Sequence, residues 1–167
     1  MSRFDAQWLA DQRRQPVGAD GRPRVLSEIG CAPVLSSAAV RSEEDEQRDV
    51  ITWRDASDRP ELALLFHVPN GELRTKGVGG RLRAMGTLAG VPDLLLAVPR
   101  GRFCGLAIEM KGARADGSLG DTTPRQRSVL DLMERWGWAV AVCWTSAQAT
   151  AAITEYLDDP EAVVSGS

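Results

Sequence analysis

The chain has 167 residues, a formal net charge of −3 and 43% apolar residues. This length suits one domain with a substantial core, and the apolar runs are far shorter than the ~20 residues that cross a bilayer. The first residues carry many charges and few apolar side chains, unlike a signal peptide, so the sequence predicts a cytoplasmic protein.

Cysteine and histidine are too sparse for several kinds of site. Cys31, Cys104 and Cys143 form no CxxC pair, which argues against a disulfide framework and a zinc site. His67 is the single histidine, so a serine or cysteine hydrolase triad would depend on it alone. We interpret Cys104 and Cys143 as small buried residues, and His67 as a hydrogen-bonded strand residue rather than a substrate contact.

Charge is distributed unevenly along the chain. The stretch from Glu72 to Arg114 has eight basic and three acidic residues, a surplus of five positive charges, whereas the segment after Trp144 has four acids and no lysine or arginine. A basic segment beside carboxylates is what a polyanionic substrate requires. The alternative is an ordinary solvated surface, because charge patterning is a weak signal.

In chain order, residues 1–41 come first; glycine and proline break their periodicity, and we interpret them as an N-terminal extension, partly ordered at best. A helix is predicted to begin after Ser42, a good N-cap, with acids in its first turn that complement the helix dipole. Glu43 and Gln47 would lie at the polar end of its apolar stripe. The alternative is that the acids only cap the helix and cover a solvated surface.

The next elements are a strand, a turn and a helix. Glu61–Val68 is mostly apolar and predicts a strand buried on both faces. Pro69-Asn70-Gly71 is a turn signal, and Thr75–Met85 is interpreted as a short helix. This helix would contain three glycines, namely Gly77, Gly79 and Gly80. Each costs about 1 kcal/mol relative to alanine, so the helix is marginal or its backbone is approached closely by a phosphate or a neighbouring element.

The most informative stretch is a predicted hairpin with strands Leu94–Val98 and Phe103–Lys111. Asp93 directly precedes the first strand, and Glu109 and Lys111 lie two residues apart on one face of the second. If that face lies near Asp93, two carboxylates and one ammonium converge at a sheet edge. Such a set suits a hard divalent cation and an activated water.

The last part of the domain begins with another helix. Thr123 is its predicted N-cap, followed by Pro124 at N1 and Gln126 at N3. Because Thr-x-x-Gln is a capping box, one interpretation is that Gln126 serves only the helix. A buried strand, Trp138–Trp144, and a helix, Ser146–Leu157, follow, and 158–167 form a frayed tail.

The predicted elements define an α/β fold. Their order is helix, strand, helix, strand, strand, helix, strand, helix (α-β-α-β-β-α-β-α). A mixed β-sheet flanked by helices on both sides is the natural packing for this order.

The motifs, taken in this order, resemble those of the PD-(D/E)XK nucleases. Gly90-Val91-Pro92-Asp93 followed by Ile108-Glu109-Met110-Lys111 matches their signature. Over about residues 42–157 the surroundings are similar to the virus-type replication-repair nuclease (VRR-NUC) domain, and the resemblance implies a restriction-endonuclease-like fold. The shared features are Ser42-Glu43 with Gln47, Pro69-Asn70-Gly71, Arg81-Leu82, Gly86 and Gln126.

The resemblance implies a metal site. Asp93, Glu109 and the backbone carbonyl of Met110 would bind Mg²⁺ or Mn²⁺. Glu43 on the opening helix would complete the set, and Glu46 is the second choice because the register of that helix is open at this stage.

The resemblance also implies catalytic and DNA-contacting roles. Lys111 would position or deprotonate the attacking water and stabilise the developing negative charge, and Gln126 matches the glutamine that the family places at the site. Contacts with the phosphate backbone of DNA are expected from five polar or basic side chains: Asn70, Arg74, Lys76, Arg81 and Arg83.

The implied activity is that of a metal-dependent DNA endonuclease or structure-selective nuclease, phage-encoded and acting in replication, repair or recombination. Its expected partners are DNA, including branched DNA, a second copy of the chain and a helicase. One alternative is a non-cleaving nuclease-fold module that binds branched DNA or a helicase. Another is a small structural α/β protein in which the motifs coincide by chance.

Overall fold

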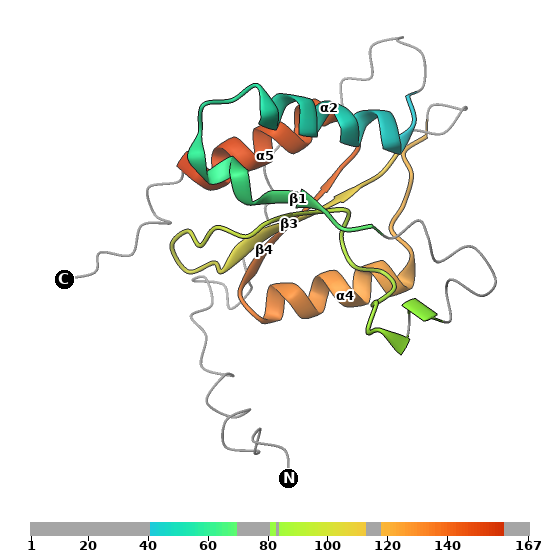
Figure 1. Ribbon diagram of the computed structural model, residues 1–167. Coiled ribbons are helices and arrows are strands. Elements are labelled where there is room, and N and C mark those ends of the chain that lie inside the picture. The colour runs from blue at the N-terminus through green and yellow to red at the C-terminus, as the bar shows by residue number, and fades with distance from the viewer. Residues whose placement is uncertain (1–40, 70–80, 83, 113–117, 159–167) are drawn as a thin grey trace.

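The computed structural model describes residues 41–69, 81–82, 84–112 and 118–158, and within them an open four-stranded sheet with helices on both faces (Figure 1). The strands lie in the order β1-β2-β3-β4 across the sheet. β2 is antiparallel to both β1 and β3, and β4 is parallel to β3. The strands are β1 (Leu65–His67), β2 (Leu94–Leu96), β3 (Gly105–Met110) and β4 (Trp138–Cys143). The sheet is therefore mixed, as predicted.

In the part of the chain that the structure describes, three α-helices cover the sheet. α2 (Glu43–Asp55) and α5 (Ser146–Asp158) pack against each other on one face, and α4 (Pro124–Arg135) lies on the opposite face (Figure 1). The short 3₁₀ helix η2 (Pro60–Leu64) leads from α2 into β1. Because helices cover both faces of the sheet, its central strand can be buried completely.

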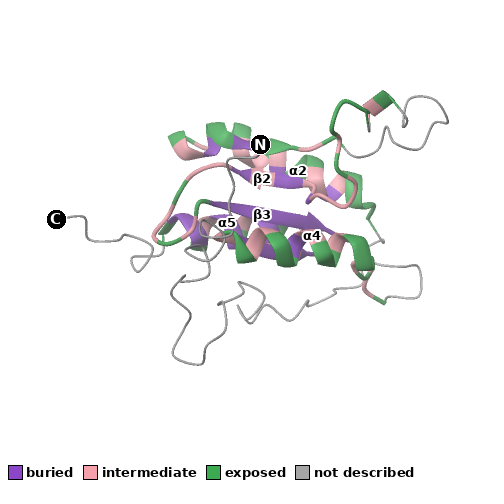
Figure 2. Ribbon diagram, turned by 90° about the horizontal axis from the view of Figure 1, so that it is seen from below, coloured by how far each residue is buried: buried purple, intermediate pink, exposed green. Residues whose placement is uncertain are grey.

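β3 is that central strand, and all six of its residues are buried (Figure 2). Leu106, Ile108 and Met110 belong to the larger apolar cluster, which includes residues of α2 and α5. Ala107 belongs to a smaller cluster with Leu130 of α4 and its neighbours. Side chains alternate along a strand, so Glu109 emerges on the same side as Ala107, towards α4.

Local capping chemistry explains where two helices begin. The Ser42 hydroxyl accepts a hydrogen bond from the backbone N–H of Asp45 at the start of α2. Thr123 and Gln126 form a complete capping box at the start of α4, with Pro124 at its first position. Both N-caps agree with the sequence prediction.

The prediction of a strand over Glu61–Val68, buried on both faces, is wrong in extent and burial. Pro60 begins η2 instead, because its fixed φ suits the first turn of a helix, and only three residues of β1 remain in the sheet. β1 lies at the edge of the sheet, where Phe66 and His67 are exposed. Of the predicted helix Thr75–Met85, the residues 81, 82 and 84 are helical and 75–80 and 83 lie outside the described residues.

The two cysteines in the described part of the chain differ in burial. Cys143 is buried at the end of β4, as predicted, whereas Cys104 is exposed. The prediction for Cys104 is wrong: β3 begins at Gly105, two residues after the predicted start at Phe103, and Cys104 precedes it. Among the described ranges, no helix combines the length and the apolar character of a membrane span.

Candidate active site at the end of the central strand

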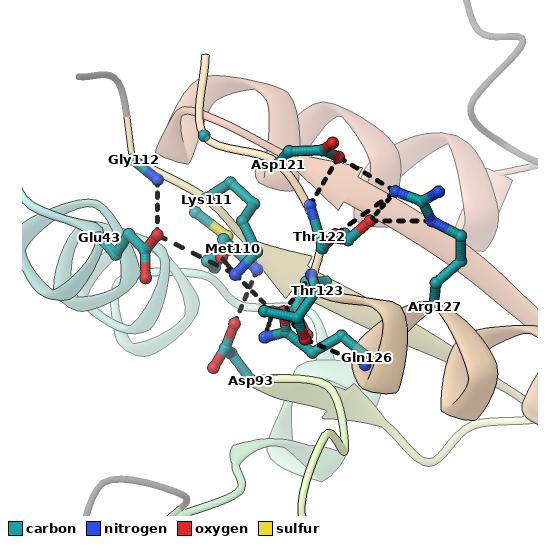
Figure 3. A network of polar contacts seen from close by, with 12 residues as sticks. Glu43, Asp93, Met110, Lys111, Gly112, Asp121, Thr122, Thr123, Gln126 and Arg127 are labelled. Atoms are coloured by element: carbon teal, nitrogen blue, oxygen red, sulfur yellow. Dashed lines mark hydrogen bonds and ion pairs between the residues drawn. The ribbon is translucent and has the colours of Figure 1, made fainter.

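Strand pairing brings the predicted carboxylates together. Leu94 pairs with Ile108, so Asp93, directly before β2, lies beside the last residues of β3. The Asp93 Oδ2 atom accepts a hydrogen bond of 2.9 Å from the backbone N–H of Met110. Asp93, Glu109 and Lys111 therefore meet where β3 ends. Figure 3 shows Asp93, Met110 and Lys111 at this place.

Glu109 is fully buried, and its two carboxylate oxygens have different surroundings. Its Oε1 lies 2.6 Å from Lys111 Nζ and accepts a hydrogen bond from Gln126 Nε2. Its Oε2 is buried and has no hydrogen-bond partner among the described residues. One oxygen is thus held by two donors, and the other is left without a donor.

Burial also changes the protonation of this carboxylate. Burial raises the pKa of Glu109, the negative charge of Asp93 acts in the same direction, and Lys111 opposes both, so that the pKa lies at about 7. Burial also raises the pKa of Asp93, although the Met110 N–H and Lys111 favour its charged form. The two carboxylates disfavour each other's ionisation, and a cation between them would relieve this.

Lys111 is buried as well, and its ammonium lies among three oxygen atoms. In addition to Glu109 Oε1, its Nζ donates to the Met110 carbonyl at 3.0 Å and lies 4.0 Å from Glu43 Oε1. Its backbone N–H donates to the Cys143 carbonyl at 2.8 Å, which holds this residue against the end of β4. The ammonium is a fixed positive charge in the site.

The structure places Glu43, and not Glu46, next to Lys111. Glu43 Oε1 accepts a hydrogen bond of 3.0 Å from the Gly112 N–H, which fixes the carboxylate at the edge of the site (Figure 3). Glu46 Oε2 accepts a hydrogen bond of 2.6 Å from the Ser146 N–H at the start of α5. Glu43, the carboxylate preferred from the sequence, therefore faces the site. Glu46, the second choice, links α2 to α5 instead.

Gln126 serves the helix and the site at once. Its Oε1 accepts hydrogen bonds of 2.9 Å from the backbone N–H and from the hydroxyl of Thr123. Its Nε2 donates to Glu109 Oε1. The capping interpretation of Gln126 and the site interpretation are thus compatible.

The predicted site residues did not include His67, Gly112 and Thr123, which contact this site. The His67 ring Nδ1 lies 3.0 Å from the Asp93 carbonyl and 2.9 Å from Gln47 Nε2, as expected for a hydrogen-bonded strand histidine. The capping box was visible in the sequence and could have indicated Thr123. No local signal indicates Gly112, whose partner is 69 residues away in the sequence.

Most of the residues predicted to contact DNA lie outside the described residues. Arg81 is described, and it is exposed on the segment before β2. The other members of the group fall outside the described residues: Asn70, Arg74, Lys76 and Arg83.

The residues present fit a divalent cation that keeps several waters. Among the described ranges, no three side chains from histidine, cysteine, aspartate and glutamate converge closely enough to form a complete metal cage. Mg²⁺, however, is usually bound through one or two carboxylates together with water and substrate phosphate. The unpartnered Glu109 Oε2 and the raised pKa values of Asp93 and Glu109 are what such a pair shows without its cation.

Comparison with solved structures gives a protein described as "VRR_NUC domain protein". It superposes with a TM-score of 0.58 and 23% sequence identity, over 71% of this chain and 89% of that chain. This chain has the fold of that protein. The VRR_NUC likeness confirms, at the level of the fold, what the sequence resemblance predicts. No family model and no curated protein matches the sequence.

Proposed function

We propose that the chain is a metal-dependent DNA nuclease of the VRR-NUC type, which hydrolyses phosphodiester bonds. The observation that carries the proposal is the arrangement around Glu109. One of its oxygens is held by Lys111 and Gln126, the other has no partner among the described residues, and Asp93 lies alongside. Metal-dependent phosphodiester hydrolysis uses such a set: neighbouring carboxylates with an oxygen left for a cation, and a positive charge close to the reacting phosphate.

Asp93, Glu109 and the Met110 carbonyl would hold Mg²⁺ or Mn²⁺, with Glu43 at the outer edge of the site. Such an ion supplies Lewis acidity: it polarises the phosphate and lowers the pKa of a bound water. Lys111 Nζ would position the attacking water and stabilise negative charge on the phosphoryl oxygens, because an ammonium is a compact point charge and this one is held at the site.

The local charge supports a nucleic-acid substrate. Arg81 is exposed on the segment that leads to Asp93, within the stretch that has a surplus of positive charge. With Asn70, Arg74, Lys76 and Arg83 it would contact the phosphate backbone, which gives affinity without sequence readout. Preference for branched DNA, a role in replication, repair or recombination, and phage origin are part of the proposal. A homodimer, which would supply one site per strand, and a helicase partner stay predictions.

The direct test is a cleavage panel of linear, flap, splayed and four-way-junction DNA with Mg²⁺ or Mn²⁺. We expect cleavage of at least one substrate and a loss of about 100-fold or more in Asp93→Asn, because a metal-binding carboxylate becomes a neutral amide. Asp131→Asn makes the same chemical change on the exposed side of α4 and should cleave like the wild type.

Calorimetric titration with Mn²⁺ separates the nuclease from the non-cleaving module. Saturable binding that Asp93→Asn abolishes supports a metal site. If no substrate is cut and no Mn²⁺ binds, the nuclease proposal fails and a DNA-binding module is the better description. Equal cleavage by the wild type and Asp93→Asn would also overturn the proposal.

A further inference from the structure

Thr123, the N-cap of α4, is linked to the site through the side chain of Gln126. Thr123 donates two hydrogen bonds of 2.9 Å to Gln126 Oε1, one from its backbone N–H and one from its hydroxyl. The same hydroxyl accepts a hydrogen bond of 3.3 Å from the Gln126 N–H. A hydroxyl has one donor and two acceptor positions, so these contacts can coexist (Figure 3).

These contacts decide which way the Gln126 carboxamide points. The carboxamide of glutamine has an oxygen that accepts hydrogen bonds and an NH₂ that donates them. The two groups are similar in size, so hydrogen bonding decides which way the carboxamide points. With the oxygen held by two donors of Thr123, the nitrogen must face Glu109. The reversed amide would place its NH₂ against the backbone N–H of Thr123 and its oxygen against a carboxylate, and it would lose the hydrogen bond that its oxygen accepts from the Thr123 hydroxyl.

The orientation matters because Glu109 cannot replace a lost donor with water. Its side chain is fully buried, and Oε1 has two donors, Gln126 Nε2 and Lys111 Nζ. Removing one donor from a buried carboxylate leaves part of its hydrogen-bonding capacity unmet. The carboxylate would then turn, and Oε2 would no longer be the oxygen left for a cation.

We infer that Thr123 is a positioning residue of the active site: it orients the Gln126 carboxamide, which in turn fixes the carboxylate of Glu109. The expected effect on catalysis rests on the proposed function, whereas the orienting contact does not. Groups that orient metal-binding side chains typically change metal affinity or activity by 10–100-fold when they are mutated.

A structural role of Thr123 as a helix cap can be separated from this positioning role. Thr123→Val keeps the branched shape and removes the hydroxyl, whereas Thr123→Ser keeps the hydroxyl. Gln126→Glu retains an oxygen for the two Thr123 donors, because glutamate also closes a capping box, but it has no NH₂ to donate to Glu109. Ser128→Ala removes another hydroxyl of α4, which binds the Pro124 carbonyl away from the site.

We expect Thr123→Val to lower kcat and to weaken Mn²⁺ binding by about tenfold. KM for DNA should change by less than about twofold, because Thr123 is not proposed to contact the substrate. Thr123→Ser should restore both properties, Gln126→Glu should lose kcat and some stability because its carboxylate faces the buried Glu109, and Ser128→Ala should match the wild type. If Thr123→Val melts at a lower temperature but keeps the wild-type kcat and Mn²⁺ affinity, Thr123 is only a cap and the inference is wrong.

An NMR measurement tests the orientation without reference to cleavage. The Gln126 side-chain NH₂ signals, assigned by their loss in Gln126→Glu, should show slow hydrogen exchange in the wild type and in Thr123→Ser, and fast exchange in Thr123→Val. If the wild type cuts no DNA but shows this pattern, the proposed function fails and the orienting contact stands. If exchange is equally fast in all three, the orienting contact is refuted even where the protein is a nuclease.

Discussion

Lys111 Nζ lies 2.6 Å from Glu109 Oε1, and both side chains are buried at the end of β3. Two charges removed from water are stable only when each finds further partners, and here the Met110 carbonyl and Gln126 provide them. The contacts that build the candidate active site therefore also stabilise these buried charged groups at the end of β3. Substitutions at these positions must be judged by stability as well as by cleavage.

The first prediction concerns this pair. Lys111→Met should destabilise the metal-free protein by about 3 kcal/mol, because Glu109 loses a buried positive partner. The double variant Lys111→Met/Glu109→Gln should lose less than the sum of the two single variants, with a coupling of about 1–3 kcal/mol. Urea unfolding of the four proteins at about pH 9, where the Glu109 carboxyl of the wild type is ionised, measures this coupling. Additive losses would show that the two buried groups do not depend on each other.

The second prediction is a pH dependence of stability. The pKa of Glu109 is about 7 in the folded protein against an ordinary value of 4.5, so the folded state holds this proton more tightly than the unfolded state. The stabilisation is complete below pH 4.5 and is lost as the pH rises through about 7. In EDTA, stability should fall by about 3 kcal/mol across this window because of Glu109. The raised pKa of Asp93 adds to the fall in the same direction.

Glu109→Gln is the control for this titration, because it cannot lose a proton. Its urea-unfolding free energy should vary much less between pH 4.5 and about 8 than that of the wild type. Saturating Mn²⁺ should oppose the decline in the wild type, since a cation favours the ionised pair. An identical pH slope in the wild type and the variant would assign the titration to other groups.

Features that depend on neighbouring residues could be predicted from the sequence. The N-caps Ser42 and Thr123 were visible because capping joins residues three positions apart. The meeting of Asp93 with Glu109 follows from two adjacent antiparallel strands and the alternation of side chains along them. These elements need no knowledge of the rest of the fold.

Features that depend on distant residues could not be predicted. The run before β1 is as apolar as a strand, yet Pro60 begins a 3₁₀ helix there and an edge position exposes Phe66. The choice between Glu43 and Glu46 depends on how α2 sits against β3 and α5. Their partners, the backbone N–H groups of Gly112 and Ser146, are 69 and 100 residues away in the sequence.

The third prediction separates these two acids of α2. Glu46→Ala should cost about 2 kcal/mol of stability, because the Ser146 N–H at the start of α5 loses a charged acceptor in a partly buried place. Glu43→Gln should leave stability within about 0.5 kcal/mol, because its side chain is half exposed, and should weaken Mn²⁺ binding.

Urea unfolding and Mn²⁺ calorimetry on both variants provide the check. The expected pattern is opposite in the two proteins: a loss of stability without a loss of metal affinity in Glu46→Ala, and the reverse in Glu43→Gln. If Glu46→Ala is the variant that loses Mn²⁺, the assignment of Glu43 to the site is wrong.

The last prediction concerns the strand that carries the site. Gly105 begins β3 and pairs with Trp138 of β4. A Cβ at this position would overlap Trp138 Cζ3 and lie 2.9 Å from the Leu96 carbonyl oxygen, and a backbone oxygen inside a sheet has little room to move. Gly105→Ala should therefore destabilise the protein by about 2–3 kcal/mol. In a Trp138→Leu background the same change should cost about 1 kcal/mol less, because the ring overlap is gone and the contact with Leu96 is left. Urea unfolding of the two pairs measures this difference, and an equal cost in both backgrounds would show that the ring of Trp138 is not what excludes a side chain at Gly105.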